Sequence, residues 1–283
     1  MQEVRGALQG GWARLGFQRL TSVASSVYSF FDKTISIGEM EARKLRHDPT
    51  ELITRAVQPA LWLLVFGEVM ANVGAIKPPG NLSYMAFLAP GILAQSVLFI
   101  AIFYGIAVIW ERDLGILHKF LVSPTPRQAL VLGKALSAGV RALSQLIIVY
   151  ALTLLVGVAI DWNPLNLLLV IVAVFLGSAL FSTFSLIIAS LVKTRERFMG
   201  IGQILTMPLF FASSAIYPIS IMPGWLQVIS RINPLTYEVD ALRGLMIVGG
   251  TSSFGVGFDM LVLLAGMIAL VMIGSWLYPK VVM

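Results

Sequence analysis

The sequence predicts an all-α integral membrane protein with six transmembrane helices. Hydrophobic residues make up 58% of the 283 residues and charged residues only 12%, whereas soluble proteins carry roughly 45–50% and about 25%. The mean hydropathy is +0.87. Long stretches also lack any ionisable residue, and the one between Lys77 and Glu111 has 33 residues. Because a helix needs about 20 largely apolar residues to cross a bilayer, such stretches are long enough to span it.

Counting uncharged runs gives five clear spans. These runs cover residues 78–110, 142–160, 162–192, 198–230 and 260–279. A further run at 56–76 contains Glu68 but is counted as the first span. The predicted spans are about 54–76, 84–110, 140–160, 165–192, 198–220 and 258–279.

The distribution of Lys and Arg predicts the orientation. With the N-terminus inside, the cytoplasmic segments hold 17 of these residues and the external segments hold 3. Basic residues concentrate on the cytoplasmic side of membrane proteins. We therefore expect both termini in the cytoplasm and a multi-pass location in the bacterial inner (plasma) membrane.

The first 50 residues are expected to stay in the cytoplasm, since no apolar run of signal-peptide type follows the early charges. Residues 1–31 form an extension without an assigned role. Residues 32–50 are interpreted as an amphipathic helix at the inner interface, although a solvated helix is the alternative. Arg43 and Arg46 belong to a basic cluster that ends at Pro49 and would face anionic lipid or a partner protein.

The segment 111–139 is too long for a plain connection between two helices. Leu114, Leu117, Phe120 and Leu121 have helical spacing, and the prolines at 124 and 126 end that pattern. We expect a short helix with an exposed apolar face, which indicates a partner. The alternative is that this helix packs back on its own bundle.

A helical hairpin is predicted at 221–250, between spans five and six. Trp225, Val228, Ile229 and Ile232 fall on one face of a short first helix. Asn233 and Pro234 are suited to the cap and first position of a second helix. In that helix Asp240 and Arg243 are three residues apart and can meet on one face. The hairpin is too charged to span, and we expect it to dip into the outer leaflet with its backbone covered by protein.

These segments resemble a known family. The motifs are Glu111-Arg112-Asp113, Leu121-Val122-Ser123-Pro124, Tyr217-Pro218-Ile219, Met222-Pro223-Gly224-Trp225-Leu226, Ile232-Asn233-Pro234-Leu235-Thr236-Tyr237 and Val239-Asp240-Ala241-Leu242-Arg243. In this order they are similar to the ABC-2 type permeases, especially the membrane subunit of daunorubicin-resistance exporters. The resemblance covers about residues 35–280, which places residues 51–283 in an ABC-2 transmembrane domain of the type V exporter kind.

The resemblance implies an interface helix, a coupling helix resting on a nucleotide-binding subunit, and an external re-entrant hairpin. The implied contacts with the ATPase subunit are Glu111, Arg112, Asp113, Gly115, Leu121, Pro124, Arg43 and Arg46. The implied residues of the external gate hairpin are Tyr217, Pro218, Asn233, Pro234, Tyr237, Asp240 and Arg243. The partners would be two copies of an ABC ATPase subunit, a second copy of this chain or a related permease, and membrane lipid; no nucleic acid is expected.

The chain carries no phosphate-binding loop of the Gly-x-x-x-x-Gly-Lys-Ser/Thr type, since the nearest string, Gly133-Lys134-Ala135, lacks the second glycine and the hydroxyl. We therefore expect no cofactor on this chain, with ATP and Mg²⁺ on the partner ATPase. With no cysteine and two histidines in the sequence, no metal site and no catalytic residue are predicted.

We hypothesise that polar residues of spans two and five line the translocation path. They are Gln95, Ser96, Tyr104, Gln203 and Thr206. Two rival classes remain. An ion-coupled secondary transporter would use buried ionisable residues, of which Glu68 is the one candidate, and a membrane-embedded lipid-modifying enzyme would need clustered acids or histidines. The expected cargo of the exporter is an amphipathic drug, a lipid-like compound or a glycan-linked compound.

Overall fold

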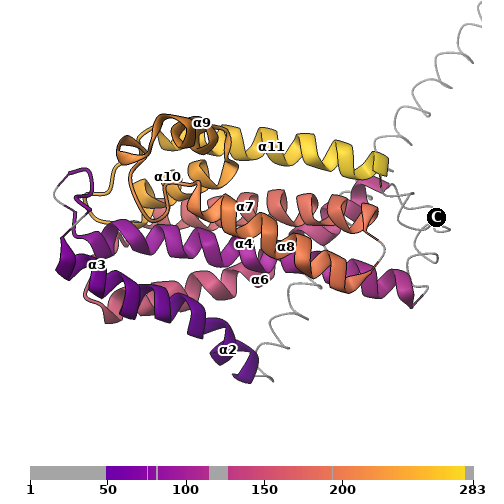
Figure 1. Cartoon of the computed structure of the whole chain (residues 1–283), viewed down its shortest axis with the longest axis horizontal. Coiled ribbons are helices and arrows are strands. Elements are labelled where there is room, and N and C mark those ends of the chain that lie inside the picture. Colours follow the sequence, from indigo (N-terminus) through magenta and orange to yellow (C-terminus); the bar gives the residue numbers. More distant parts are fainter. Residues whose placement is uncertain (1–48, 75, 81, 115–126, 193, 278–283) are drawn as a thin grey trace, which may run out of the picture.

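The computed structural model describes residues 49–74, 76–80, 82–114, 127–192 and 194–277. Within these ranges the protein is an elongated bundle of helices that run along a common axis (Figure 1). Five helical segments are long and apolar enough to cross a membrane: Thr54–Val73, Tyr84–Ala107, Gly133–Leu155, Pro164–Leu191 and Val256–Leu277. The all-helical membrane architecture is thus confirmed. Residues 1–48, with Arg43 and Arg46, and residues 115–126, with Gly115, Leu121 and Pro124, lie outside the described residues.

The remaining predicted span corresponds to helix α8 (Arg195–Phe211), which has 17 residues. At 1.5 Å per residue it is about 26 Å long, somewhat short of a 30 Å hydrocarbon core. After α8 the chain continues through non-helical residues 212–218. A sixth complete crossing therefore stays a prediction.

The first span is not a continuous α-helix. It consists of α2 (Pro49–Ala60), the π-helical turn η1 (Leu61–Gly67) and α3 (Glu68–Val73). Pro59 lies inside α2 and cannot donate a backbone hydrogen bond, which favours a change of helical geometry just after it. Glu68 is exposed on α3.

Two helices form the centre of the bundle. α4 (Tyr84–Asp113) begins at Ser83, whose hydroxyl accepts a hydrogen bond from the Ala86 backbone N–H at 3.2 Å. α7 (Pro164–Leu191) has Asn163 as its cap and packs against α4, α6, α10 and α11. α4 is the most buried of the membrane helices, whereas few residues of the first span and of α11 (Val256–Leu277) are fully buried. The core therefore lies along α4 and α7.

Helix α6 (Arg127–Leu155) begins well before the expected third span at 140. The uncharged run that predicts this span begins after Arg141. In the structure, Lys134 and Arg141 belong to the same continuous helix. At its other end, residues 156–163 lie against the end of α10 (Pro234–Met246), where the Asp161 N–H donates to the Met246 carbonyl at 2.9 Å. The Asn163 backbone N–H and then the Asn166 amide lower the pKa of Asp161.

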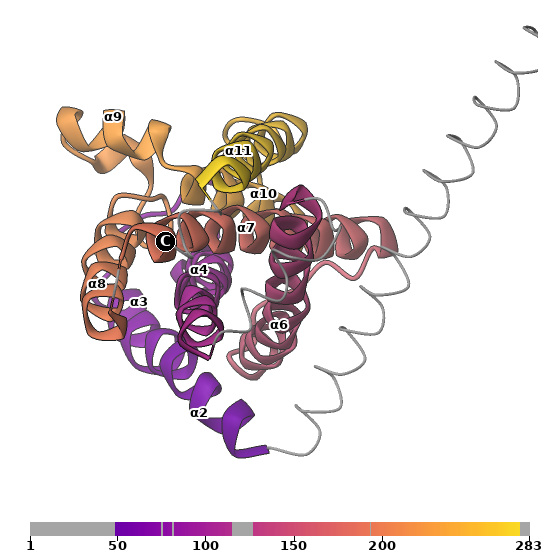
Figure 2. The same cartoon turned by 90° about the vertical axis from the view of Figure 1, so that its right-hand side faces the viewer.

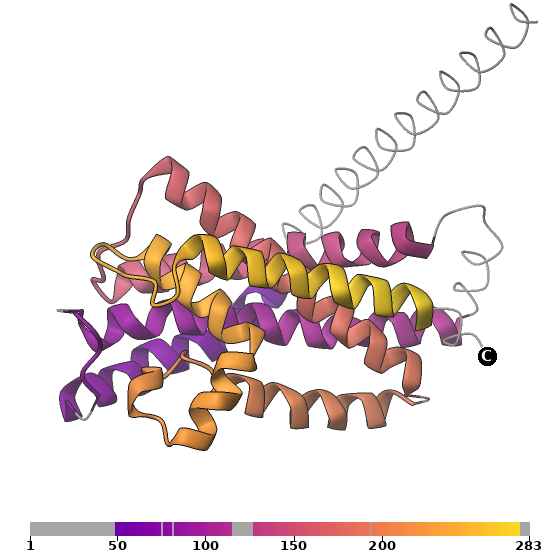
Figure 3. The ribbon, with the colours of Figure 1, turned by 90° about the horizontal axis from the view of Figure 1, so that it is seen from above.

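The predicted hairpin is confirmed as two helices, α9 (Gly224–Ile232) and α10. α10 packs against α4, α7 and α11, whereas α9 lies at the outer edge of the bundle (Figure 2). The apolar side chains of α9 point away from the protein: Trp225, Val228, Ile229 and Ile232 are all exposed. Figure 3 shows the hairpin at the end of the bundle opposite the α7–α8 connection. We call these the hairpin end and the loop end.

Candidate functional site

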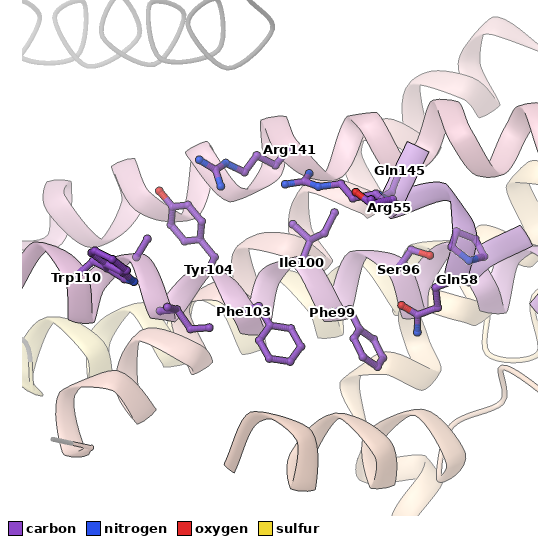
Figure 4. A pocket seen from close by; sticks show the side chains of 14 residues that line it. Arg55, Gln58, Ser96, Phe99, Ile100, Phe103, Tyr104, Trp110, Arg141 and Gln145 are labelled. Atoms are coloured by element: carbon purple, nitrogen blue, oxygen red, sulfur yellow. The ribbon is translucent and has the colours of Figure 1, made fainter. Parts of the chain in front are cut away.

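A cavity of about 600 Å³ lies between α2, α4 and α6 in the half of the bundle nearer the loop end (Figure 4). Its polar lining comes from all three helices and comprises Thr54, Arg55, Gln58, Ser96, Tyr104, Arg141 and Gln145. The volume is within the range of about 300–1,000 Å³ that is usual for small-molecule sites. The cavity is thus large enough to hold a ligand.

Aromatic side chains of α4 supply a large part of the apolar lining. Phe99, Phe103 and Trp110 belong to it, together with Ile100. In Figure 4 Phe99 and Phe103 project from the side of α4 opposite the Arg141 and Tyr104 side chains. The cavity is consequently amphipathic, with a polar and an aromatic side.

Two contacts and one unpartnered atom describe the polar side. The Arg141 guanidinium carbon lies 5.3 Å from the centre of the Tyr104 ring, which holds this side chain toward α4. The Ser96 hydroxyl donates to the Ile92 carbonyl at 2.8 Å. Gln145 is only 2% exposed, and its Oε1 has no hydrogen-bond partner among the described residues. A buried amide oxygen of this kind is unfavourable unless a ligand or water satisfies it.

The residues predicted to line the translocation path are only partly brought together. Ser96 and Tyr104 share the cavity. Gln95, 1% exposed on α4, is not among the residues that line it. On α8, Gln203 is exposed and Thr206 is fully buried, donating to the Gly202 carbonyl at 2.5 Å. The structure therefore separates the α8 residues from Ser96 and Tyr104.

Sequence reasoning missed five polar residues of the cavity: Thr54, Arg55, Gln58, Arg141 and Gln145. A signal was present for the two glutamines, which interrupt otherwise apolar spans. The charge count takes both arginines as cytoplasmic, at the ends of the predicted spans 54–76 and 140–160. The orientation of both arginines toward one cavity depends on helix packing and had no signal in the sequence.

An ionic cluster fixes the loop end of α4 to the start of α8. The Asp113 carboxylate accepts hydrogen bonds from Arg195 Nε at 3.2 Å and Nη2 at 2.8 Å. The Arg195 guanidinium also stacks on the Trp110 ring, 3.7 Å from its centre. Arg112 donates to the Val192 carbonyl at 3.1 Å. Arg112 and Asp113, predicted to contact an ATPase subunit, thus also contact the α7–α8 connection of their own chain, while Glu111 lies within α4.

At the hairpin end, Arg243 joins three segments that are distant in the sequence. Its Nη2 donates to the Ser214 carbonyl at 2.7 Å and to the Phe87 carbonyl at 3.4 Å. The guanidinium lies 3.8 Å from the centre of the Phe87 ring. Arg243 Nη1 is 3.9 Å from Asp240 Oδ1, so the pairing predicted from their spacing is confirmed. The side chain links α10 to α4 and to residues 212–218.

Asp240 connects α10 to the turn before α11. Its Oδ2 accepts hydrogen bonds from the Ser252 hydroxyl at 2.8 Å and from the Phe254 N–H at 2.9 Å. The Ser252 oxygen is also 2.8 Å from Asp259 Oδ2 in the first turn of α11. A serine hydroxyl has one hydrogen, so Ser252 can donate it to only one of the two carboxylates at a time. Ser252 and Asp259 were not identified from the sequence.

Asn233 links the hairpin to α8. Its Oδ1 accepts from the Leu235 N–H at 3.0 Å, which confirms the predicted cap, and its Nδ2 donates to the Leu209 carbonyl at 2.7 Å. Pro234 follows at the first position of α10. The Tyr237 hydroxyl donates to the Arg231 carbonyl at 2.5 Å and thereby ties α10 to α9.

Tyr217 and Pro218 lie in the segment between α8 and α9. The Tyr217 hydroxyl donates to the Phe211 carbonyl at the end of α8. Pro218 is buried and precedes η2 (Ile219–Ile221). The residues predicted for the hairpin region are thus found at one end of the molecule, where they contact α4, α8 and each other.

Glu238 is buried in the same region, with no polar partner in the described part of the chain. The residue is 0% exposed, and neither carboxyl oxygen has a hydrogen-bond partner among the described residues. It lies over Gly177 of α7, where an added Cβ would meet the Glu238 carboxyl carbon at 2.3 Å. Burial without partners favours the neutral form of a carboxyl group. The missing side chain at position 177 provides the space that Glu238 occupies.

Replacing Gly177 by alanine is expected to lower the free energy of unfolding by about 1–3 kcal/mol, the usual penalty for overfilling a packed site. Thermal unfolding in detergent micelles, followed by circular dichroism, measures this loss. Gly200→Ala is the matched control, because a Cβ at Gly200 in α8 meets no atom within 4 Å. Adding Glu238→Ala to Gly177→Ala should restore part of the stability. Equal melting temperatures for the two alanine variants would contradict the proposed steric contact.

Among the described residues, no three His, Cys, Asp or Glu side chains are grouped as ligands for a metal ion. In the described part of the chain, Asp240 and Asp259 both contact Ser252.

Comparisons with known proteins agree with this architecture. Residues 34–247 match the family model described as ABC-2 type transporter. A protein named transport permease ycf38 from Cyanophora paradoxa is 29% identical over 238 residues, which cover 82% of this chain and 79% of that protein. The daunorubicin resistance ABC transporter permease protein DrrB1 of Streptomyces coeruleorubidus is 28% identical, covering 74% of this chain and 72% of its own length. The probable multidrug ABC transporter permease YbhR of Escherichia coli is 31% identical over 58% of this chain and 44% of its own.

Proposed function

This chain belongs to the ABC-2 type transporter family, and from this premise we propose that it is the membrane-spanning permease subunit of an ATP-driven exporter. A separate ATPase, present in two copies and carrying the ATP and Mg²⁺, supplies the energy. Two copies of this chain, or this chain and a related permease, enclose the path. The cargo is an amphipathic drug, a lipid-like compound or a glycan-linked compound.

The observation that carries the proposal is the amphipathic cavity at the loop end. With the N-terminus in the cytoplasm, as the 17 to 3 distribution of basic residues favours, the loop end faces the cytoplasm and the hairpin end faces outward. A cavity bounded by α2, α4 and α6 in the cytoplasmic half can take up an amphiphile before export. The exposed apolar face of α9 then lies at the outer leaflet.

The Asp113–Arg195 cluster suggests how force reaches the membrane helices. In the proposed exporter the ATPase pushes on the segment 115–126, which directly follows α4. Because Arg112 and Asp113 bind Val192 and Arg195, a displacement at the end of α4 is passed to the start of α8. The contacts of Arg43, Arg46 and Glu111 with the ATPase are part of the same proposal.

Co-expression with an ATPase encoded next to this chain tests the proposal. We expect the two subunits to co-purify, to hydrolyse ATP and to transport a fluorescent amphiphile across proteoliposome membranes. The matched control replaces the phosphate-binding lysine of the ATPase, which should remove hydrolysis and transport but leave the complex intact. Efflux driven by a proton gradient in the absence of any ATPase would contradict the proposal and favour an ion-coupled transporter.

A further inference from the structure

Two carboxyl groups at the hairpin end share one serine hydroxyl. The Ser252 oxygen lies 2.8 Å from Asp240 Oδ2 on α10 and 2.8 Å from Asp259 Oδ2 in the first turn of α11. Both are hydrogen-bond distances between two oxygen atoms, so each contact needs a hydrogen between them. Ser252 supplies one of these two hydrogens. The other has to come from one of the two carboxyl groups.

The third hydrogen bond of Ser252 agrees with this count. Its oxygen accepts the Gly255 N–H at 2.7 Å. A hydroxyl oxygen has two lone pairs, so after the Gly255 N–H one lone pair is left for a carboxyl O–H. Ser252 therefore makes its full set of hydrogen bonds when it donates to one aspartate and accepts from the other.

The surroundings of the two aspartates differ in a way that places the proton on Asp259. Asp240 accepts a further hydrogen bond from the Phe254 N–H at 2.9 Å, and its Oδ1 is 3.9 Å from Arg243 Nη1. Both contacts favour the ionised form of Asp240. Asp259 is 0% exposed, and its Oδ1 has no hydrogen-bond partner among the described residues. Burial of this kind costs an ionised carboxylate far more than a neutral acid.

The elements that pack most closely against α11 are α6, α7 and α10. Neither α7 nor the turn 247–255 has an ionisable side chain. On α10, Glu238 lies over Gly177 of α7. The remaining ionisable residues of these elements, apart from the Asp240–Arg243 pair, are Tyr237 on α10 and Arg127, Lys134, Arg141 and Tyr150 on α6. In the described part of the chain, the charged group that shares a hydrogen-bond partner with Asp259 is Asp240, which is paired with Arg243.

We propose that Asp259 and Ser252 form a proton-dependent latch between α11 and α10, closed when Asp259 is protonated and open when it is ionised. In the closed state the Asp259 carboxyl donates to Ser252, which donates to Asp240. When the proton passes to water, two carboxylates compete for one hydroxyl hydrogen, and a second negative charge lies beside Asp240. The contact between the first turn of α11 and α10 is then released.

The place of the latch determines which solution it senses. Thr251 and Ser253 are exposed in the turn that carries Ser252, so water reaches the edge of the cluster. With the orientation that the basic residues favour, the hairpin end faces outward. The latch therefore responds to the pH outside the membrane, where a low pH closes it and a high pH opens it. It does not depend on the nature of the cargo.

Carbon-13 NMR of the full-length chain in micelles, labelled at the aspartate carboxyl carbons, tests where the proton lies. The signal that disappears in Asp259→Asn belongs to Asp259. At about pH 5 an ordinary aspartate, with a pKa of about 3.9, is more than nine-tenths ionised. We expect the Asp259 signal to be that of a protonated acid at this pH and to titrate below about pH 9. A signal that is already ionised at pH 5, or still protonated at pH 9, overturns the latch.

Hydrogen–deuterium exchange of the backbone N–H groups of residues 252–259 tests whether the latch opens. Rates are divided by those of the unfolded peptide at the same pH, which removes the intrinsic effect of pH on exchange. In the unaltered chain we expect exchange at about pH 8 to be about tenfold faster than at about pH 5, as for the loss of one hydrogen bond to a charged group. Equal corrected rates at the two pH values overturn the latch.

Three variants assign the effect to this cluster. Asp259→Asn cannot ionise and its amide can donate to Ser252, so exchange should be slow at both pH values. Ser252→Ala removes the shared hydroxyl and should give fast exchange at both. Asp161→Asn is the matched control and should keep the pH dependence, because Asp161 lies at the same end of the bundle and its lowered pKa keeps it ionised throughout. A pH dependence that survives unchanged in Asp259→Asn or in Ser252→Ala overturns the proposal.

Discussion

Replacing Arg243 by methionine is expected to lower the free energy of unfolding by about 3–5 kcal/mol, the effect of removing one partner of a buried charged pair. The Arg243 and Asp240 side chains are only 6% and 2% exposed. Without the guanidinium, the Ser214 and Phe87 carbonyls lose their donor and Asp240 loses its nearest positive charge. Unfolding in mixed micelles with a rising fraction of dodecyl sulfate, followed by circular dichroism, measures the change.

Arg231→Met provides the control for this experiment. Arg231 is exposed on α9, so its replacement removes the same charge from the same hairpin with little expected change in stability. Adding Asp240→Asn to Arg243→Met should recover part of the loss, because the uncompensated negative charge is then removed. If Arg243→Met were as stable as Arg231→Met, Arg243 would not be the link between α10 and α4 that its contacts indicate.

The second prediction concerns Asp113, whose replacement is expected to lower transport and not stability. Asp113→Arg should lower ATP-driven transport by at least about fivefold, the lower end of usual coupling between sites, because it replaces the acceptor of Arg195 by a like charge. The folded state should be little affected, since Asp113 is 38% exposed and exposed ion pairs contribute about 0–1 kcal/mol. Transport into proteoliposomes that contain the ATPase subunit, together with ATP hydrolysis, measures the effect.

A charge swap separates this coupling from nonspecific damage. Asp113→Arg combined with Arg195→Asp restores an ion pair and should recover much of the transport. Glu196→Arg, an equal change of charge at an exposed neighbouring position, serves as control and should leave transport near normal. With Asp113→Arg alone, we expect the assembled transporter to keep hydrolysing ATP but to lose most of its transport. Normal transport in that variant would show that the α4–α8 link carries no force.

The hairpin could be predicted from the sequence because its signals are local. Asn233 and Pro234 mark a helix start within two residues, and Asp240 and Arg243 pair within one turn. The partners of Arg243 could not be predicted in the same way. The Phe87 carbonyl is 156 residues away in the chain, and nothing in the composition of α4 indicates which of its carbonyls faces α10.

The lining of the cavity, in contrast to the hairpin, could not be predicted from local sequence signals. Counting uncharged runs identifies spans by the absence of charge, so Arg55 and Arg141 count as cytoplasmic charges at the ends of the predicted spans 54–76 and 140–160, and not as cavity residues. The same method could not orient α8, which is apolar on most of its surface, and Gln203 is exposed there while Ser96 and Tyr104 line a cavity between other helices. The side of a mostly apolar helix that faces its neighbours depends on tertiary packing and not on periodicity.

The buried charges of α10 also constrain how the protein is made. An Asp or Arg at the centre of a membrane-spanning helix opposes entry into lipid by about 2.5–3.5 kcal/mol, so we expect α10 to enter the membrane together with the groups that bind its charges. Its acceptors on α4 and at Ser214 are synthesised before it, whereas Ser252 and Phe254 emerge after it. The ribosome must therefore pass residue 254 before Asp240 gains its hydrogen bonds, and docking of α10 becomes a late step of biogenesis that follows insertion of the earlier spans.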